Sequence, residues 1–291
     1  MTHPRDRSEF LAEFGLRNRG LIADSDQSAL SQSCILIAGC GSTGGAAVEP
    51  LVRAGAMRMI LVEPGRYELH NLNRQRATLD AIGHNKAAWL ARSAHAINPY
   101  LDLEVHETGI SPQNADGMTP RADLIIDAID VTSMEGLRAK CALHESAASA
   151  RRPVISAYDL AYRQYVCVYD YRQLRAPLRG KIDRVRKART PTEGLARLIP
   201  FRAIPYELLQ EIERLQDEPN ASISQLGCAA DLFGALVVPL SVELLANRRV
   251  KDSYVVDLKD PSLPFSRRAV RRMKTIAGLI RLQMRMFRSA T

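Results

Sequence analysis

The sequence predicts an α/β fold with a mainly parallel sheet and flanking helices, continued by antiparallel strands. From Ser33 onward, short runs rich in β-branched residues alternate with helical segments of roughly 12–16 residues, the pattern of parallel βαβ units. A glycine-rich turn, GCGSTGG, joins the first of these runs to its helix. Residues 163–171 then change to an alternating pattern, which is typical of an antiparallel strand.

The first half of the chain supplies the expected parallel strands and the helices between them. Each strand is a short apolar run, and each helix carries apolar residues at helical spacing. We expect strands at residues 34–39, 58–63, 101–107, 122–130 and 153–157. We expect helices at residues 42–56, 84–98 and 133–150, with Pro50 interrupting the first of them.

The chain changes character after its parallel strands. Residues 163–171 are the expected antiparallel strand, and residues 171–225 are long, basic and irregular, with one amphipathic helix at 206–216. An apolar helix at 225–247 and a last strand at 253–258 return the chain to the core. The parallel part is therefore expected to be one domain, with 171–225 as an excursion from it.

The composition is that of a soluble globular protein, with 46% hydrophobic and 25% charged residues. The N-terminal stretch is polar, so a secretion signal is not expected, and no apolar run approaches the roughly 18–20 residues that span a bilayer. The five cysteines include no C-x-x-C pair, so no zinc site is expected. These features favour a cytoplasmic protein.

The net charge of +8 is concentrated in the last 27 residues, which hold eight basic residues and no acidic one. Apolar residues recur there at a spacing of three or four, which predicts an amphipathic helix. They are Val270, Met273, Ala277, Ile280, Met284 and Phe287. This helix could pack on the body or a dimer mate, bind nucleic acid, or dock on a membrane surface or an acidic partner.

The turn after the first strand carries a nucleotide-binding pattern. Gly39, Gly41 and Gly44 have G-x-G-x-x-G spacing between a strand and a helix, which lets backbone N–H groups approach a phosphate. Glu63 ends the second strand about 20 residues later, where an acid can bind ribose hydroxyls. The pattern predicts a Rossmann-like nucleotide site for either NAD or ATP.

Three charged residues favour ATP. Arg74 and Lys86 follow the second strand and are expected to reach over the glycine turn. Hydride transfer leaves a pyrophosphate untouched, whereas cleavage of ATP builds up charge that cations stabilise. Asp130 ends the fourth strand, at the sheet edge where ligand groups gather, and is expected to hold Mg²⁺. An NAD-dependent oxidoreductase is thus the disfavoured alternative.

The chain resembles the ThiF/HesA/MoeB family, the bacterial relatives of ubiquitin-activating enzymes, in ILIAGCGSTGG, LVEPGRYELHNLNRQ, GHNKAAW with INP, and DLIIDAID. The likeness covers about residues 17–170 and resumes weakly at about 225–258. It implies a phosphate turn at Gly39, Gly41 and Gly44, a ribose acid at Glu63, phosphate-side residues at Asn71, Arg74, Gln75 and Lys86, and a metal-binding and catalytic aspartate at Asp130.

The resemblance implies an adenylyltransferase that binds ATP and Mg²⁺ and activates a carboxylate as an acyl-adenylate, releasing pyrophosphate. The usual substrate is the C-terminus of a small ubiquitin-like protein or a precursor peptide. Members are commonly homodimers in which an N-terminal arginine enters the partner's site, and Arg19 matches it best, with Arg17 second.

One branch of the family instead dehydrates threonylcarbamoyladenosine in tRNA. The sequence IDAID and the basic stretch at 174–187 look somewhat like that branch, so it is the alternative function. The low aromatic content, 5%, counts against it, because RNA-binding surfaces commonly stack bases on aromatic rings.

Two positions depart from the family's pattern. Gly65 stands where a second acid is usual, and Val131 stands where an asparagine commonly follows the catalytic aspartate. These departures leave open a non-catalytic nucleotide-binding scaffold.

Thioester-forming members carry a cysteine in the crossing segment, which has none here, and we expect Cys167 and Cys228 to be buried structural thiols. Adenylation without a catalytic-cysteine thioester is therefore expected.

These observations divide the chain into three parts. Residues 1–32 are expected to be an N-terminal helical segment and possible dimer arm. Residues 33–260 are the expected ATP-binding adenylation domain, with the basic crossover excursion at 171–225. Residues 261–291 are the basic amphipathic C-terminal tail.

Overall fold

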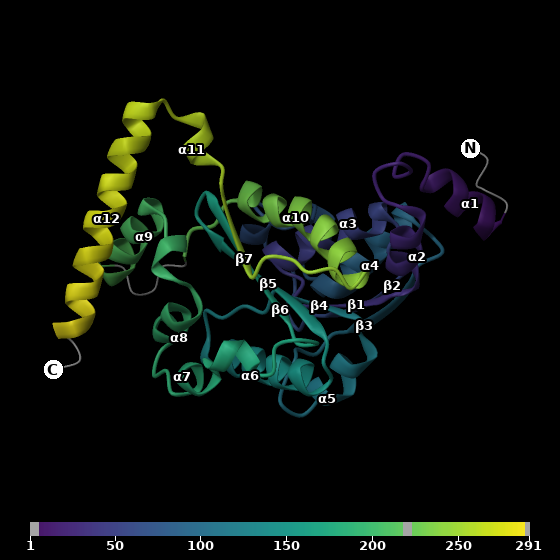
Figure 1. Cartoon of the computed structure of the whole chain (residues 1–291), viewed down its shortest axis with the longest axis horizontal. Coiled ribbons are helices and arrows are strands. Elements are labelled where there is room, and N and C mark those ends of the chain that lie inside the picture. The colour runs from purple at the N-terminus through teal and green to yellow at the C-terminus, as the bar shows by residue number, and fades with distance from the viewer. Residues whose placement is uncertain (1–5, 218–222, 289–291) are drawn as a thin grey trace.

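The structure, a computed structural model, describes residues 6–217 and 223–288 (Figure 1). At its centre is a seven-stranded sheet with the order β3-β2-β1-β4-β5-β6-β7. The strands are β1 Cys34–Ala38, β2 Arg58–Val62, β3 Asp102–His106, β4 Leu124–Asp127, β5 Pro153–Leu160, β6 Arg163–Asp170 and β7 Ser253–Asp257. Strands β1 to β5 pair in parallel, whereas β6 and β7 are antiparallel, so the predicted fold class is confirmed.

Helices cover both faces of the sheet, which explains why its central strands are continuous apolar runs. Side chains alternate along β1: Ile35 and Ile37 join one apolar core, and Leu36 and Ala38 join the other. The first core lies under α2 (Asp24–Gln32), α3 (Ser42–Ala54), α4 (Lys86–Ile97) and α10 (Gly227–Leu245). The second lies under α5 (Ala115–Met118), α6 (Met134–Ser149), α7 (Ile182–Arg186) and α8 (Pro191–Leu198).

The strand order places a ligand site at one edge of the sheet. From β1 the chain proceeds to β2 and β3 on one side, and it then crosses over to β4 and β5 on the other. The carboxyl ends of β1 and β4 therefore meet at a topological switch point, where open α/β sheets bind their ligands. The glycine turn follows β1, and Asp130 follows β4, so the fold brings these two predicted features together.

Pro50 lies inside α3 without ending it, so the predicted interruption is wrong. A proline in a helix cannot donate to the carbonyl four residues earlier, here that of Ala46. Helix α10 packs tightly at this point, because a Cβ on Gly234 would lie 2.6 Å from the Ala46 oxygen and 3.4 Å from Pro50 Cγ. We infer that packing against α10 outweighs the missing hydrogen bond.

Part of the segment after β6 packs against the body of the protein. Helices α7 and α8 pack on α6, and a Cβ on Gly194 of α8 would lie 2.3 Å from Leu137 of α6. The remaining helices are α1 Arg7–Phe14, α9 Tyr206–Asp217, α11 Lys259–Ser262 and α12 Phe265–Arg288. Figure 1 shows α12 at one end of the molecule, beside α9.

Helix α10 is the one helix of the described residues that is long and apolar enough to cross a membrane, although we expected no such run. This is weak evidence for a span, because core helices of globular proteins meet the same criterion. Here Phe233, Val237 and Leu240 are buried in the core shared with α3 and the sheet.

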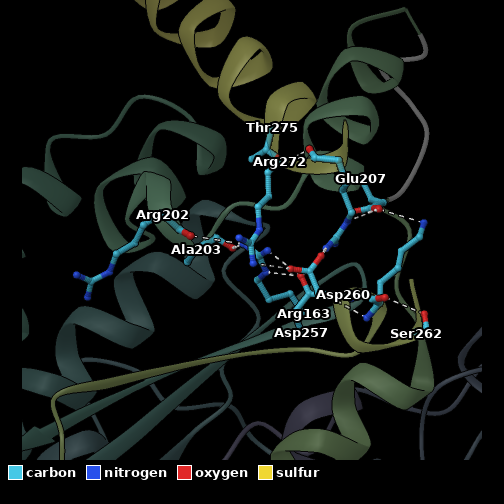
Figure 2. Close-up of polar contacts among 11 residues, drawn as sticks. Arg163, Arg202, Ala203, Glu207, Asp257, Asp260, Ser262, Arg272 and Thr275 are labelled. Atoms are coloured by element: carbon cyan, nitrogen blue, oxygen red, sulfur yellow. Dashed lines mark hydrogen bonds and ion pairs between the residues drawn. The ribbon is translucent and has the colours of Figure 1, made fainter. Parts of the chain in front are cut away.

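An ionic cluster fastens α12 to the body. Arg271, with 7% exposure, donates to Glu207 Oε2 of α9 at 2.8 Å and to Asp257 Oδ2 at the end of β7 at 2.8 Å. It also donates to Asp260 of α11, and Arg163 of β6 donates to the same Asp257 oxygen at 2.7 Å. Figure 2 shows the three carboxylates converging below α12. One arginine thus joins three separate elements.

Replacing Arg271 with methionine is expected to lower the free energy of unfolding by about 3 kcal/mol, because three carboxylates lose their shared cation. The matched control is Arg272→Met, on the same helix turn. Arg272 is 72% exposed and lies 3.8 Å from Asp260, so its loss should cost about 0.5 kcal/mol or less. Urea unfolding of both variants checks this, and equal midpoints would contradict it.

Candidate active site

The glycine turn is shaped by close contacts with the loop after β4. Gly39 has φ +91°, and a Cβ there would lie 2.3 Å from the carbonyl oxygen of Ala128. A Cβ on Gly44 would lie 1.8 Å from the carbonyl oxygen of Gly39. Gly41 differs, because the nearest atom to its added Cβ would be Gln75 Nε2 at 3.9 Å. The turn is therefore tight at Gly39 and Gly44 and open at Gly41, where a phosphate can approach the start of α3.

Glu63 lies directly against this turn. Its Oε2 accepts a hydrogen bond from the backbone N–H of Cys40 at 2.8 Å, and its Oε1 accepts one from Gly65 at 2.8 Å. Asn85 caps α4 and donates to the Glu63 carbonyl oxygen at 2.7 Å. Because each carboxylate oxygen can accept a second hydrogen bond, Glu63 retains the capacity to bind a ribose hydroxyl.

Lys86 opens α4 on the same side of the turn as Glu63. Its Nζ lies 5.9 Å from the ring centroid of Tyr67 and would be 3.5 Å from a Cβ placed on Gly65. The structure therefore brings Lys86, Glu63 and the glycine turn together, as the sequence predicted.

The loop that holds Arg74 folds over the other side of the turn. Ser42, in the first turn of α3, donates to the Arg74 carbonyl oxygen at 3.4 Å. The Arg74 guanidinium donates from Nε to Gln225 Oε1 at 2.6 Å, and from Nη1 to the carbonyl of His70 at 2.9 Å and to Asn73 Oδ1 at 3.0 Å. The cation is thus near α3 but is held by neutral acceptors.

Asn71 and Gln75 shape this loop. Asn71 is buried, its Oδ1 accepts from the N–H of Glu68 at 3.1 Å, and its carbonyl accepts from the N–H groups of Arg74 and Gln75 at 3.1 and 2.9 Å. Asn71 therefore orders the loop, and Gln75 Oε1 is a buried acceptor without a partner among the described residues, beside the glycine turn.

Asp130 is exposed at the switch point. Its Oδ1 accepts from Thr132 N at 2.9 Å and from Thr132 Oγ1 at 2.7 Å. The described residues contain no group of three His, Cys, Asp or Glu side chains that would hold a metal alone. A Mg²⁺ that arrives with ATP needs only one or two carboxylates, because phosphate oxygens and waters complete its shell. Asp130 fits that use.

Arg19 lies away from the other predicted site residues. Its Nη2 donates to the carbonyl of Ala12 at 3.4 Å, and its neighbour Asn18 donates to the carbonyls of Arg53 and Ala54 at 3.3 Å. Those carbonyls are at the C-terminal end of α3, roughly 20 Å from the glycine turn at 1.5 Å per residue. Within one chain, Arg19 is therefore separate from the site.

A family model described as ThiF family matches residues 16–275. The chain belongs to the ThiF family. It is 26% identical to the adenylyltransferase and sulfurtransferase MOCS3 of Anopheles gambiae over 167 residues. That alignment covers 57% of this chain and 35% of that protein. The chain is 30% identical to the sulfur carrier protein adenylyltransferase of Thermus thermophilus over 110 residues. That alignment covers 38% of this chain and 41% of that protein. The chain spans less than half the length of these two relatives.

Solved structures show the same fold. PaaA aligns with a TM-score of 0.61 and 16% identity, over 89% of this chain and 83% of that one. The Escherichia coli tRNA N6-threonylcarbamoyladenosine dehydratase in complex with ATP aligns with a TM-score of 0.58 and 18% identity, over 84% and 98%. Escherichia coli MccB with ATP aligns with a TM-score of 0.53 and 15% identity, over 76% and 58%.

The structure gives a physical reason for both departures from the ThiF-family pattern. A Cβ on Gly65 would lie 2.6 Å from Glu63 Oε1, so a second acid there would displace the first from its present position. Val131 is buried in the core beneath α6, which leaves its neighbour Asp130 at the surface. Both residues therefore fit the geometry of the site and leave Glu63 and Asp130 in place.

The cysteines are partly as expected. Cys167 is buried, but Cys228 is exposed, so the expectation of a buried Cys228 is wrong. Cys228 lies in the first turn of α10, where Ala229 and Ala230 take the buried side of the helix. An apolar helix can thus leave one side of its first turn in solvent, which its composition does not show.

Asp159 is a site residue that sequence reasoning missed. It follows Ile155 and Ala157 on the face of β5 that packs toward α3 and α10, so an acid in that alternation was the available signal. The Gln164 amide, oriented toward its acceptors, donates to Asp159 Oδ1 at 2.7 Å, whereas Oδ2 is buried and has no hydrogen-bond partner among the described residues. Burial raises the pKa of Asp159 to about 6, against the lowering effect of the Thr43 hydroxyl.

Replacing Asp159 with asparagine is expected to stabilise the ligand-free protein at pH 8. Because the pKa is raised to about 6 on folding, the ionised carboxylate costs stability above that pH, and this cost disappears as the pH falls toward 4. The expected gain is on the order of 2 kcal/mol at pH 8 and near zero at pH 4. Urea unfolding at both pH values checks this, and a gain that does not depend on pH would contradict it.

A second missed feature is a buried polar network beneath the Asp130 loop. Asp127, at the end of β4, accepts hydrogen bonds from Lys140 Nζ, from Ser156 Oγ at 2.6 Å and from His144 Nε2 at 2.9 Å. His144 Nδ1 lies 2.6 Å from the Tyr171 hydroxyl. Burial opposes ionisation of Asp127, but Lys140 and His144 outweigh it and hold its pKa well below the usual range. Burial lowers the pKa of His144, so its imidazole stays neutral.

Proposed function

We propose that this ThiF-family chain is an ATP- and Mg²⁺-dependent adenylyltransferase that activates a carboxylate as an acyl-adenylate and releases pyrophosphate. The observation that carries the proposal is a glycine turn that is open at Gly41, with Glu63 and Lys86 on one side and the Arg74 loop on the other. An acid for the ribose and two cations for the phosphates thus flank one helix N-terminus.

Each residue of the candidate site has a role that follows from its position. Backbone N–H groups at the start of α3 bind the phosphates, and Glu63 binds the ribose. Lys86 and Arg74 neutralise the charge that builds up as the α-phosphorus is attacked by the substrate carboxylate and pyrophosphate departs. Arg74 must first leave Gln225, which exchanges a neutral acceptor for a charged one. Asp130 would hold Mg²⁺, which would supply positive charge beside the phosphates.

The substrate that we propose is the C-terminal carboxylate of a ubiquitin-like protein or a precursor peptide. The relative named sulfur carrier protein adenylyltransferase supports a protein as the substrate. Gln75 Oε1 has no hydrogen-bond partner among the described residues, so it is an acceptor for an N–H or O–H donor of either ATP or the substrate. We propose no cysteine thioester, since the crossing segment at 171–225 contains no cysteine.

We also propose that the enzyme is a homodimer in which Arg19 completes the partner's site. Arg19 is exposed and far from its own chain's glycine turn, so it can act only in a second copy. Arg19→Ala and Asp130→Asn should each lose pyrophosphate exchange, and a mixture of the two should recover part of it through mixed dimers with one intact site. Absence of recovery after the chains have been unfolded and refolded together would contradict this arrangement.

A second candidate function is activation of a carboxylate on tRNA. It is favoured by exposed cations in the segment after β6, which could contact RNA phosphates. They are Arg175, Arg184, Lys187 and Arg189. The fold likeness to the tRNA dehydratase extends over 98% of that chain.

Trapping with hydroxylamine separates these possibilities. The protein is incubated with ATP, Mg²⁺ and either ubiquitin-like proteins, precursor peptides or modified tRNA, and hydroxamate and AMP are measured. We expect hydroxamate on a protein or peptide C-terminus, whereas a signal with tRNA would select the second candidate. If the protein binds ATP but forms no AMP with any of the substrates, it is a scaffold. If it binds NAD in preference to ATP, an oxidoreductase is indicated.

A further inference from the structure

The outer face of α12 carries a continuous stripe of large apolar side chains. Phe265, Val270, Met273, Ile276, Ile280 and Met284 are each between 45% and 79% exposed. With about 100° between successive residues, all six fall within an arc of roughly 140°. The side chain of Phe287, which the sequence pattern adds to the stripe, is outside the described side chains. Single exposed apolar residues need no explanation, but an aligned row of six does.

The opposite face of α12 is already occupied, so the stripe cannot turn inward. Gly278 packs so closely on α9 that a Cβ there would lie 2.8 Å from Leu209 Cδ1. Leu279 and Leu282 pack against the core, and Arg271 is fixed by its three carboxylates. The body therefore holds α12 in one rotation about its axis, with the stripe exposed. Figure 1 shows α12 at one end of the molecule.

Cations flank the stripe on both sides. By the same helical spacing, Arg267, Lys274 and Arg281 fall along one edge and Arg272 along the other, and all four are exposed. The helix contains no acidic residue. A second copy of this helix would therefore bring like charges together along both edges, which opposes self-association through this face. Nucleic acid would match the cations but would leave the apolar stripe in contact with phosphates.

We propose that the outer face of α12 lies on the surface of an anionic lipid bilayer. A convex apolar stripe between two rows of cations fits a membrane surface, where apolar side chains enter the acyl boundary and cations stay at the headgroups. A protein partner would need a groove shaped to the stripe, whereas a bilayer needs none. Anionic headgroups supply the charge that the helix lacks. The inference is independent of the proposed adenylation.

The test is sedimentation of the full chain with vesicles of phosphatidylcholine that contain either none or about 30% phosphatidylglycerol. We expect binding to the anionic vesicles that falls at least about tenfold in the variant Met273→Ser/Ile276→Ser/Ile280→Ser, whose exposed positions leave the fold intact by circular dichroism. The charge variant Arg272→Gln/Lys274→Gln/Arg281→Gln should fall by a similar factor. The control Arg184→Gln/Lys187→Gln/Arg189→Gln removes equal charge elsewhere and should bind as the wild type.

Three outcomes would overturn the proposal. If the wild-type chain ignores anionic vesicles, the stripe serves another occupant, such as an acidic protein. If the serine variant binds as tightly as the wild type, or the control loses as much binding as the charge variant, attraction is general rather than due to α12. If light scattering shows a dimer that the serine variant dissociates, while vesicles are ignored, the face joins two copies of the chain.

Discussion

Replacing Arg74 with alanine is expected to slow pyrophosphate exchange into ATP by about 10²–10³-fold. The guanidinium supplies planar donors to phosphate oxygens whose charge increases in the transition state, and Lys86, across the turn, cannot reproduce that geometry. Arg74 lies on the loop that Ser42 ties to the first turn of α3, so its loss acts at the phosphates. ATP affinity, measured by calorimetry, should fall much less than the exchange rate.

The matched control is Arg76→Ala in the same loop. Arg76 is exposed and pairs with Asp231 of α10 at 2.7 Å, so it ties the loop to α10. Its removal should change exchange by no more than about twofold, because exposed ion pairs contribute little. Equal losses in the two variants would show that the loop's position matters and that the Arg74 cation does not.

Replacing Lys140 with methionine is expected to lower the free energy of unfolding at pH 7 by about 3–5 kcal/mol. Lys140 and Asp127 are 1% and 0% exposed, so the change leaves a carboxylate charge buried without its cation. The exposed Arg138, two residues earlier on α6, is the control, and Arg138→Met should cost about 0.5 kcal/mol or less.

The loss of stability in the Lys140→Met variant is expected to depend on pH. In the wild type the Asp127 pKa is lowered, so its contribution to stability is present above the unfolded pKa near 4 and is lost as the pH falls below it. In the Lys140→Met variant, Asp127 can become neutral by protonation, so the gap between variant and wild type should narrow from pH 7 toward pH 4. Urea unfolding across that range checks this, and a gap that widens would contradict it.

The parts of the fold that repeat a simple pattern could be predicted from the sequence. The central strands are short runs that are buried on both faces, and their bounds agree with the structure within a few residues. The glycine spacing followed by Glu63 located the tight turn of the candidate site, because backbone geometry demands Gly39 and Gly44 there. In both cases, residues that are close together in the sequence were sufficient for the prediction.

What sequence could not show depends on contacts between distant residues. Pro50 is accommodated because Gly234 lets α10 approach α3, and Arg74 is held by Gln225, which is 151 positions away. Asp159 lies beside the candidate site only because β5 ends near the start of α3. Neither periodicity nor motif spacing carries such information, so these features become visible only when the chain is folded.

The central claim is tested most directly by exchange of labelled pyrophosphate into ATP in the presence of candidate carboxylate substrates. The assay compares the wild type with Asp130→Asn and with Asp116→Asn, an exposed aspartate on α5. We predict exchange that requires one substrate, is lost with Asp130→Asn and is retained with Asp116→Asn. Silence of the wild-type chain with every substrate, together with no binding of ATP by calorimetry, would contradict the account.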